Sequence, residues 1–567
     1  MLKKYFPVFL ILIFSWWAVQ ALFHPGFFPM HDDEQIARLF ELHQAITAGQ
    51  FPPRWVADLG FGFGYPFYNF YPPLVYYLGE IFYFLGFSLI VSTKIVMISG
   101  FLLSGLFIYL LVKEIFGKIA GSVAAIFYIY APYHSVDLYV RGAQAEFYSF
   151  VFLPAVFWSA LKLVKEKSRK WLVINSLFLT LLLLSHNLIA LISFPFYFAF
   201  VGFLLLGEKE KKRVVLLFCF SVFLFLGLTA YFWLPAILER KYTLVDQILT
   251  RELANYKLHF VYLRQFISSP WGYGGSIFGL NDGMSFEVGK PHFVLSFLAG
   301  VLGLYFILKK NKKGLIFSFL FFLFAFSLFM ASFYSQFIWE RLQPLWYLQF
   351  PWRFLVFTAL FSSLLAGGMV DYLYQISQKH SFIKWLVVVV PVVLVIILNK
   401  DYFRPARYLE VTDKEYTTKE DLYWRVSKMS FEYVPKGIAT VLSDIKTTQV
   451  DIKKEELPQK SFQTIDNIKV TEQQNLPHLK RFLVEGEGGI LTINTYYFPG
   501  WEVRIDGQKV AVDDNNKFKL ITVSIPKGKH LVEANFKNTR LRIIGNSLTV
   551  VSLSLVALIW AKKCLKS

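Results

Sequence analysis

Two adjacent aspartates, Asp32 and Asp33, open a polar stretch directly after the first apolar segment of the chain. Apolar side chains then recur at helical spacing up to Gly49, a residue type that commonly ends helices. The pattern predicts an amphipathic helix on the membrane surface, with both carboxylates at its N-terminus. One aspartate suffices to cap such a helix, whereas two aspartates followed by Glu34 repel one another. We therefore expect a reaction centre here, with Asp32 or Asp33 as a general base.

The composition is that of a polytopic α-helical membrane protein. The 567 residues are 55% hydrophobic and 19% aromatic, and the mean hydropathy is +0.47. The net charge of +19 does not indicate a nucleic-acid partner, because the basic residues gather in short linkers such as 165–170, 209–213 and 309–313. The two cysteines, Cys219 and Cys564, form neither a disulfide framework nor a metal site.

Apolar runs of membrane-spanning length predict about twelve transmembrane helices. They lie near 5–23, 92–112, 119–133, 147–164, 171–186, 188–206, 214–237, 291–308, 315–333, 354–374, 382–398 and 541–561. A further apolar stretch, 73–90, contains Glu80 and two glycines, and its crossing would put four basic linkers outside. We interpret it as interfacial or re-entrant. Both termini are then cytoplasmic in a multi-pass protein of the cell membrane.

This topology places the chemistry on the outer face. The loops that share this face are 24–91, 134–146, 185–187, 238–290 and 334–353, and they are rich in aromatic residues, glycine, proline and isolated charges. The aromatic loop 62–73 is interpreted as an interfacial belt.

The C-terminal third predicts a separate extracytoplasmic domain. Alternating runs at 491–498, 501–505, 509–513, 518–525 and 530–536 are typical of antiparallel strands, and Asp506-Gly507 is a hairpin turn signal. The expected organisation is a transmembrane domain at 1–399, a small β-sandwich-like domain at 400–540, and a final helix with a cytoplasmic tail at 541–567.

No nucleotide-binding or zinc motif is present in the sequence, so an activated donor on the outer face would arrive through the lipid phase. A polyprenyl-phosphate-linked sugar fits, because its phosphate is a competent leaving group. Its transfer needs a base near the acceptor and positive charge near the phosphate. The candidate phosphate partners are Arg54, Arg141, Arg240, Lys241, Arg264, Arg341 and Arg353.

Each of these arginines could instead reach toward lipid headgroups from a helix end. Arg141 and Arg353 are the best candidates, the first because Glu146 accompanies it and the second because it starts a span after an aromatic loop. Further candidates for substrate binding are His31, Glu34, Glu146, His186 and Asn187. Local hydrogen bonding in a turn also explains Asn187.

Several segments resemble known families. HDDEQIARLFEL, GQFPPRW, GYPFYNFYPPLVYYLG and YVRGAQAE are similar to the bacterial membrane proteins described as related to 6-pyruvoyl-tetrahydropterin synthase, although no zinc-binding histidine cluster for pterin chemistry is present. The stretch from YYFPGWEVRIDGQ to IPKGKH resembles YfhO-like proteins. The order of a span, an acidic pair, an aromatic-proline loop and a non-crossing segment resembles the GT-C superfamily of membrane glycosyltransferases.

The GT-C resemblance implies inverting transfer from a polyprenyl-phosphate sugar to a glycan, lipid or envelope polymer, with an acidic residue of the first outer loop as base. Asp32 and Asp33 match that position. Some members use a divalent metal such as Mg²⁺ or Mn²⁺, so metal use stays open.

Two other classes compete with this hypothesis. A flippase or transporter of lipid-linked glycans usually has ionisable residues at mid-membrane or two repeated halves. In this sequence the predicted spans carry almost no charge, and the two halves do not match. A non-catalytic scaffold that binds glycans through its β-domain would leave both aspartates dispensable.

Overall fold

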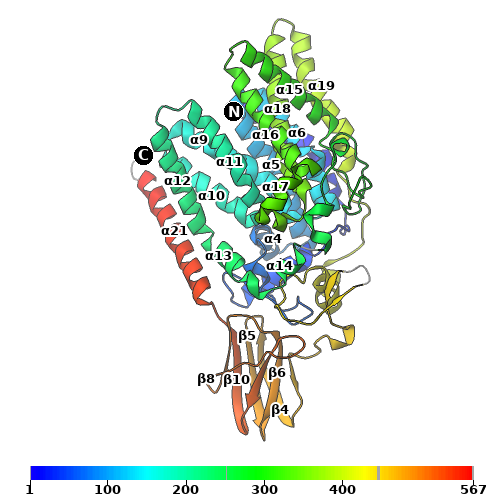
Figure 1. Ribbon diagram of the computed structural model, residues 1–567, viewed down its shortest axis with the longest axis vertical. Helices are drawn as coiled ribbons and strands as arrows, with labels where there is room; N and C mark the ends of the chain where they lie inside the picture. The colour runs from blue at the N-terminus through cyan, green and yellow to red at the C-terminus, as the bar shows by residue number, and fades with distance from the viewer. Residues whose placement is uncertain (1, 251, 444–446, 565–567) are drawn as a thin grey trace.

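The computed structural model describes residues 2–250, 252–443 and 447–564. Figure 1 shows a helical bundle with β-sheets at one end, and the last helix, α21, runs from the sheets along the edge of the bundle. The helices are α1 Leu2–Phe14, α2 Trp16–Val19, α3 Gln35–Thr47, α4 Leu74–Phe84, α5 Leu89–Phe116, α6 Lys118–Ile129, α7 Pro132–Ser135, α8 Gln144–Phe147, α9 Ser149–Glu166, α10 Arg169–Ser185, α11 Asn187–Leu206, α12 Lys211–Leu228, α13 Ala230–Leu238, α14 Val245–Ile248, α15 Lys290–Leu308, α16 Lys313–Ala331, α17 Gln336–Arg341, α18 Leu355–Ile376, α19 Ser381–Asn399, α20 Ser427–Met429 and α21 Arg540–Cys564.

Eight helices of the described chain are long and apolar enough to cross a membrane, or nine when α12 and α13, bent by 69°, count as one span. Every predicted apolar run forms helix. Fewer than the expected twelve or so helices are long enough to cross a membrane, however. Helix α6 has 12 residues, about 18 Å, against a hydrocarbon thickness of about 30 Å. It ends early because Ala131 precedes Pro132 and is extended.

The stretch 73–90 folds as a short helix and a turn. Helix α4 has 11 residues, about 16 Å, and the chain then turns through Gly86 at φ +95°. Glu80 accepts a hydrogen bond from His43 Nδ1 at 2.9 Å. The length agrees with the prediction that this stretch does not cross.

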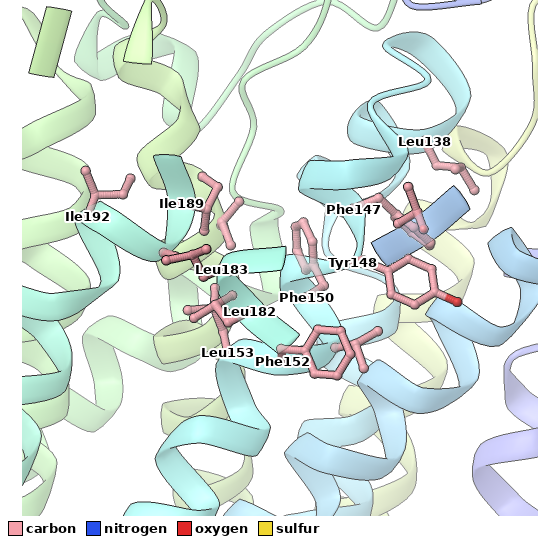
Figure 2. Close-up of a cluster of buried hydrophobic side chains, with 14 of the residues drawn as sticks. Leu138, Phe147, Tyr148, Phe150, Phe152, Leu153, Leu182, Leu183, Ile189 and Ile192 are labelled. Carbon is pink, nitrogen blue, oxygen red and sulfur yellow. The ribbon is translucent and has the colours of Figure 1, made fainter. Parts of the chain in front are cut away.

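The bundle core surrounds α18, whose residues 355–371 are all buried. Gly367 allows close packing on α6, since a Cβ there would lie 2.5 Å from the carbonyl oxygen of Ala120. Side chains of α8 to α11 form a neighbouring apolar cluster, including Phe150, Leu153 and Leu182 (Figure 2).

The aromatic loop 62–73 is not the predicted interfacial belt. Tyr65, Phe67 and Phe70 are buried and contact the ring of Tyr433. Because Tyr433 comes from the segment after the bundle, this contact could not be read from local hydropathy.

The strands form a two-stranded sheet of β1 Thr440–Leu442 and β2 Thr448–Val450 and two larger antiparallel sheets. The five-stranded sheet has the order β4 Ile468–Leu476, β5 Leu479–Gly486, β10 Gly528–Phe536, β7 Trp501–Ile505 and β8 Gln508–Val510; the three-stranded sheet has the order β3 Phe462–Thr464, β6 Gly489–Tyr496 and β9 Leu520–Ile525. Phe462 and Phe482 join the larger sheets, with ring centroids 5.7 Å apart.

All five predicted strands form, and Asp506-Gly507 makes the β7–β8 turn with positive φ at both residues. The first strand begins only at Thr440. Residues 400–438 are instead irregular and helical, and they return to the segment 24–91, for example through a β-bridge between Phe27 and Leu409.

Candidate functional site

A cavity of about 930 Å³ opens between the segment 24–91 and the ends of several helices. Its polar lining includes His31, Asp32, Glu34, Arg38, Tyr71, Arg141, Glu146, His186, Asn187, Arg240, His259, Gln349, Arg353, Glu432 and Tyr433. Most of the predicted site residues therefore meet in one place.

Backbone hydrogen bonds join the acidic stretch to the segment that carries Arg141. The amide of His31 donates to the carbonyl of Val140 at 3.1 Å, and the amide of Asp32 donates to the carbonyl of Arg141 at 2.8 Å. Gly142 permits this approach, because its φ is +67° and a Cβ there would lie 2.1 Å from the sulfur of Met30.

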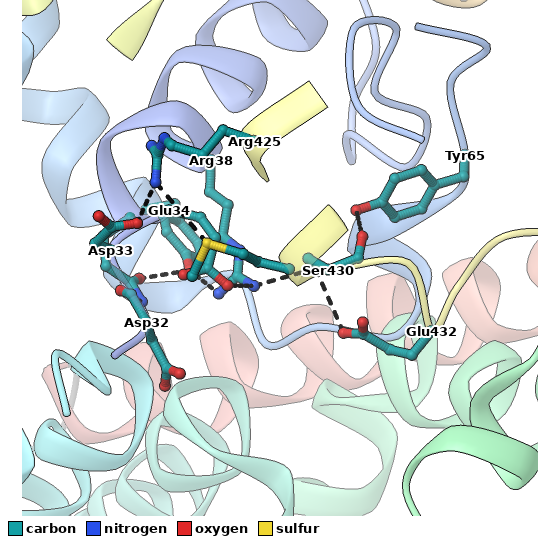
Figure 3. A network of polar contacts seen from close by, with 11 residues as sticks. Asp32, Asp33, Glu34, Arg38, Tyr65, Arg425, Ser430 and Glu432 are labelled. Atoms are coloured by element: carbon teal, nitrogen blue, oxygen red, sulfur yellow. Dashed lines mark hydrogen bonds and ion pairs between the residues drawn. The ribbon is translucent and has the colours of Figure 1, made fainter. Parts of the chain in front are cut away.

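The two adjacent aspartates have different surroundings (Figure 3). The Asp33 carboxylate pairs with Arg425, which also pairs with Asp421. Burial raises the pKa of Asp33, and Arg425 opposes that rise. Asp32 lines the cavity, and no hydrogen bond or ion pair of its carboxylate occurs within the described chain.

Neither Asp32 nor Asp33 caps helix α3. Helix α3 begins at Gln35 after the N-cap residue Glu34, and no side-chain cap hydrogen bond forms. The free carboxylate of Asp32 is thus available to accept a proton from a molecule in the cavity.

Glu34, the N-cap residue of α3, and Arg38 in the first turn of this helix form a buried ion pair at 2.9 Å. Arg38 also donates to Ser430 Oγ at 3.2 Å and lies over the ring of Tyr71 at 4.5 Å. Burial raises the pKa of Glu34 to about 7, although Arg38 lowers it. This side of the cavity is closed by the segment that contains Ser430 and Glu432.

Arg141 and Arg353 share the carboxylate of Glu146 on the opposite side. Glu146 Oε2 lies 2.8 Å from Arg141 Nη1 and 2.9 Å from Arg353 Nε, and Asp137 also pairs with Arg141. Glu146 Oε1 accepts from Tyr133 at 2.6 Å. The Nη2 atoms of the two arginines have no hydrogen-bond partner among the residues described, so both retain donors for an anion.

The remaining candidates divide into cavity residues and distant ones. His186 Nδ1 accepts from the amide of Ile189 at 3.1 Å and caps α11, which places Asn187 at the cavity wall. Arg240 lines the cavity beside Asp246, at 3.4 Å.

Four predicted phosphate partners lie elsewhere. Arg264, Arg341 and Lys241 are exposed and do not line this cavity. Arg54 is buried and donates to Asn69 Oδ1 at 2.7 Å and to Asn546 Oδ1 at 2.8 Å, so its guanidinium holds the fold together. A position in a predicted outer loop does not by itself distinguish such an arginine from one in a site.

Sequence reasoning missed Arg38, Tyr71, His259, Gln349, Glu432 and Tyr433 as cavity residues. For Arg38 a signal existed, because Glu34 precedes it by four residues on a predicted helix. Glu432 and Tyr433 lie in a segment with no helical or strand pattern, and they reach the cavity through contacts distant in sequence.

No group of three or more His, Cys, Asp or Glu side chains in 2–250, 252–443 and 447–564 is arranged to hold a metal ion.

Comparison with known proteins matches this chain to one family, and it finds proteins of lower similarity. The family described as "6-pyruvoyl-tetrahydropterin synthase related domain; membrane protein" matches residues 68–404. A Lactococcus lactis subsp. cremoris protein described as uncharacterized is 26% identical over 247 residues, which cover 41% of this chain and 40% of that protein.

Among solved structures, two crystal structures of the oligosaccharyltransferase of Archaeoglobus fulgidus are similar to this chain. The apo form gives a TM-score of 0.40 at 15% identity, over 71% of this chain and 56% of the other. The complex with Zn and sulfate gives 0.41 at 16% identity, over 71% and 53%. The chain thus spans little more than half the length of that enzyme.

Proposed function

This chain belongs to the family of membrane proteins related to 6-pyruvoyl-tetrahydropterin synthase, and we propose that it is a glycosyltransferase of the GT-C type. It transfers a sugar from a polyprenyl-phosphate donor to a hydroxyl group of a cell-surface acceptor, on the outer face of the cytoplasmic membrane. The observation that carries the proposal is the Asp32 carboxylate, which has no hydrogen bond or ion pair among the described residues and lines a cavity together with Arg141 and Arg353.

In the proposed reaction, Asp32 accepts the proton of the acceptor hydroxyl as the oxygen attacks the anomeric carbon. The bond from that carbon to the phosphate oxygen breaks, and the phosphate leaves with the electron pair. Arg141 and Arg353 stabilise the charge that develops on it. A single displacement inverts the anomeric configuration.

Glu146 holds the two guanidinium groups in place before the donor binds. Its carboxylate uses one nitrogen of each arginine and leaves the Nη2 donors free. A site arranged in advance loses less free energy on ordering when the phosphate arrives.

The apolar wall of the cavity supports a lipid-linked donor. It includes side chains of α11 and α13, among them Leu191, Phe194, Trp233 and Ile237. Leu191 is 46% exposed and Ile237 is 55% exposed, so the wall continues to the outer surface of the bundle. A polyprenyl chain would lie along it while the phosphate reaches the arginines.

The test is transfer by the purified full chain from a panel of radiolabelled polyprenyl-phosphate hexoses, with release of polyprenyl phosphate as the readout. We expect release by the unmodified chain and a loss on the order of 10²-fold in Arg141→Gln and Arg353→Gln, by analogy with the loss of a transition-state donor. Arg341→Gln, on the same predicted face but outside the cavity, is the matched control. Equal release by all four proteins would refute the proposal.

A further inference from the structure

A second cavity, of about 580 Å³, lies where α13 ends and α21 begins. Its walls come from three parts of the chain that are distant in sequence: the end of α13 with Arg240 and Lys241, Pro499 between β6 and β7, and the first turn of α21 with Arg540 and Leu541. Both helices are candidate membrane spans or parts of one. Figure 1 shows α13 and the start of α21 at the end of the bundle that faces the sheets, and the residues that line the cavity lie at this end.

The charge of this cavity is positive. Lys241 and Arg540 are exposed, and their side chains have no hydrogen bond or ion pair within the described residues. Arg240 is partly offset by Asp246, at 3.4 Å. The other carboxylate of the lining, Glu239, is already engaged by Arg542 at 2.9 Å and by Thr539 at 2.8 Å.

The apolar part of the lining is exposed to the surroundings of the bundle. Ile237 and Leu238 are 55% and 48% exposed, and Leu541 completes this side. Three cations beside an apolar surface at the end of two spans match an amphiphile with a phosphate head and acyl chains.

We propose that this cavity binds the phosphate group of an anionic membrane lipid, with its acyl chains along the apolar side chains of α13 and α21. The site is separate from the proposed transfer reaction, although Arg240 lines both cavities. Free inorganic phosphate offers the same head chemistry, but it leaves the apolar side uncovered.

The experiment titrates the purified full chain with short-chain phosphatidylglycerol, phosphatidylcholine and inorganic phosphate, by calorimetry in detergent. Lys241→Gln/Arg540→Gln removes two cations that form no ion pair within the described residues, although the Lys241 ammonium lies over the ring of Tyr242 at 5.1 Å. The matched control is Lys309→Gln/Lys310→Gln, which removes two exposed cations from a linker beyond α15. Thermal unfolding verifies that each variant is folded.

We expect phosphatidylglycerol to bind more tightly than phosphatidylcholine, and the cavity variant to lose on the order of tenfold or more in affinity, while the control keeps it. The difference should shrink at high salt. Equal affinity of the cavity variant and the unmodified chain would overturn the proposal. Inorganic phosphate binding as tightly as phosphatidylglycerol would overturn the lipid assignment and indicate a free-anion site.

Discussion

The buried ion pair between Glu239 and Arg542 fixes the sheets to the bundle, and its removal has a predictable cost. Arg542 is fully buried, and besides Glu239 it donates to the carbonyls of Pro499 and Lys537 at 2.8 and 3.3 Å. Glu239 Oε2 also accepts a hydrogen bond from Asn69 at 3.2 Å, in loop 24–91. The pair therefore joins α13, α21, the sheets and loop 24–91.

Glu239→Gln keeps the shape of the side chain but leaves the Arg542 charge buried without its anion. Removal of one partner of a buried pair costs about 3 kcal/mol or more. The amide of Lys537, which donates to Gly500 at 2.8 Å, reports on this junction. If exchange occurs through local opening, its hydrogen-exchange rate should rise on the order of 10²-fold, since each tenfold is about 1.4 kcal/mol.

Glu502→Gln is the matched control. Glu502 pairs with Lys537 at 3.0 Å but is partly exposed, so its loss should cost less than about 1 kcal/mol and raise the exchange rate at Lys537 by less than about fivefold. If Glu239→Gln raises that rate no more than Glu502→Gln does, the buried pair does not carry the junction.

Three further predictions concern topology, pH and backbone geometry. In a cysteine-free background, an impermeant thiol reagent on intact cells should label Lys469→Cys and leave Lys165→Cys unlabelled; the reverse would invert the topology. Because burial raises the folded-state pKa of Glu34 to about 7 from an ordinary 4.5, folding stability should fall as pH rises across that interval. Chemical unfolding should show a smaller fall in Glu34→Gln, and an unchanged slope would contradict the shift. Gly142→Ala should lower the transfer rate at least tenfold in the folded protein, because the new Cβ clashes with Met30 and the left-handed backbone adds about 1–2 kcal/mol of strain. Gly49→Ala is the control, because Gly49 has φ +91° and nothing within 4 Å, so its loss of transfer should not exceed the effect of strain alone. Equal losses of transfer in the two variants would exclude the clash as the cause.

The sequence was sufficient for features that depend on local pattern. Apolar runs predicted the helices, alternation predicted the strands from Gly489 to Phe536, and Glu80 with two glycines predicted that 73–90 is not an ordinary span. The chain also belongs to the family that its motifs resemble. Helix α6 shows the limit of hydropathy, because Pro132 ends it within an apolar run that continues.

The sequence was insufficient where contacts join distant residues. Nothing near Asp33 indicates that Arg425, 392 positions later, pairs with it. Likewise, Glu432 lies outside every predicted element and still lines the cavity. The choice between Asp32 and Asp33 depends on this returning segment, so the acidic pair alone left the base open.

In the proposed reaction, Asp32 is the general base, whereas Asp33 pairs with Arg425. Asparagine keeps the size of both side chains and removes the proton acceptor. In a transfer assay with a defined polyprenyl-phosphate sugar and acceptor, Asp32→Asn should fold normally and lose on the order of 10²-fold or more in rate. Asp33→Asn should keep a rate within about tenfold, because a half-exposed ion pair contributes only about 1 kcal/mol. Full activity of Asp32→Asn, or a larger loss in Asp33→Asn, would contradict the assignment.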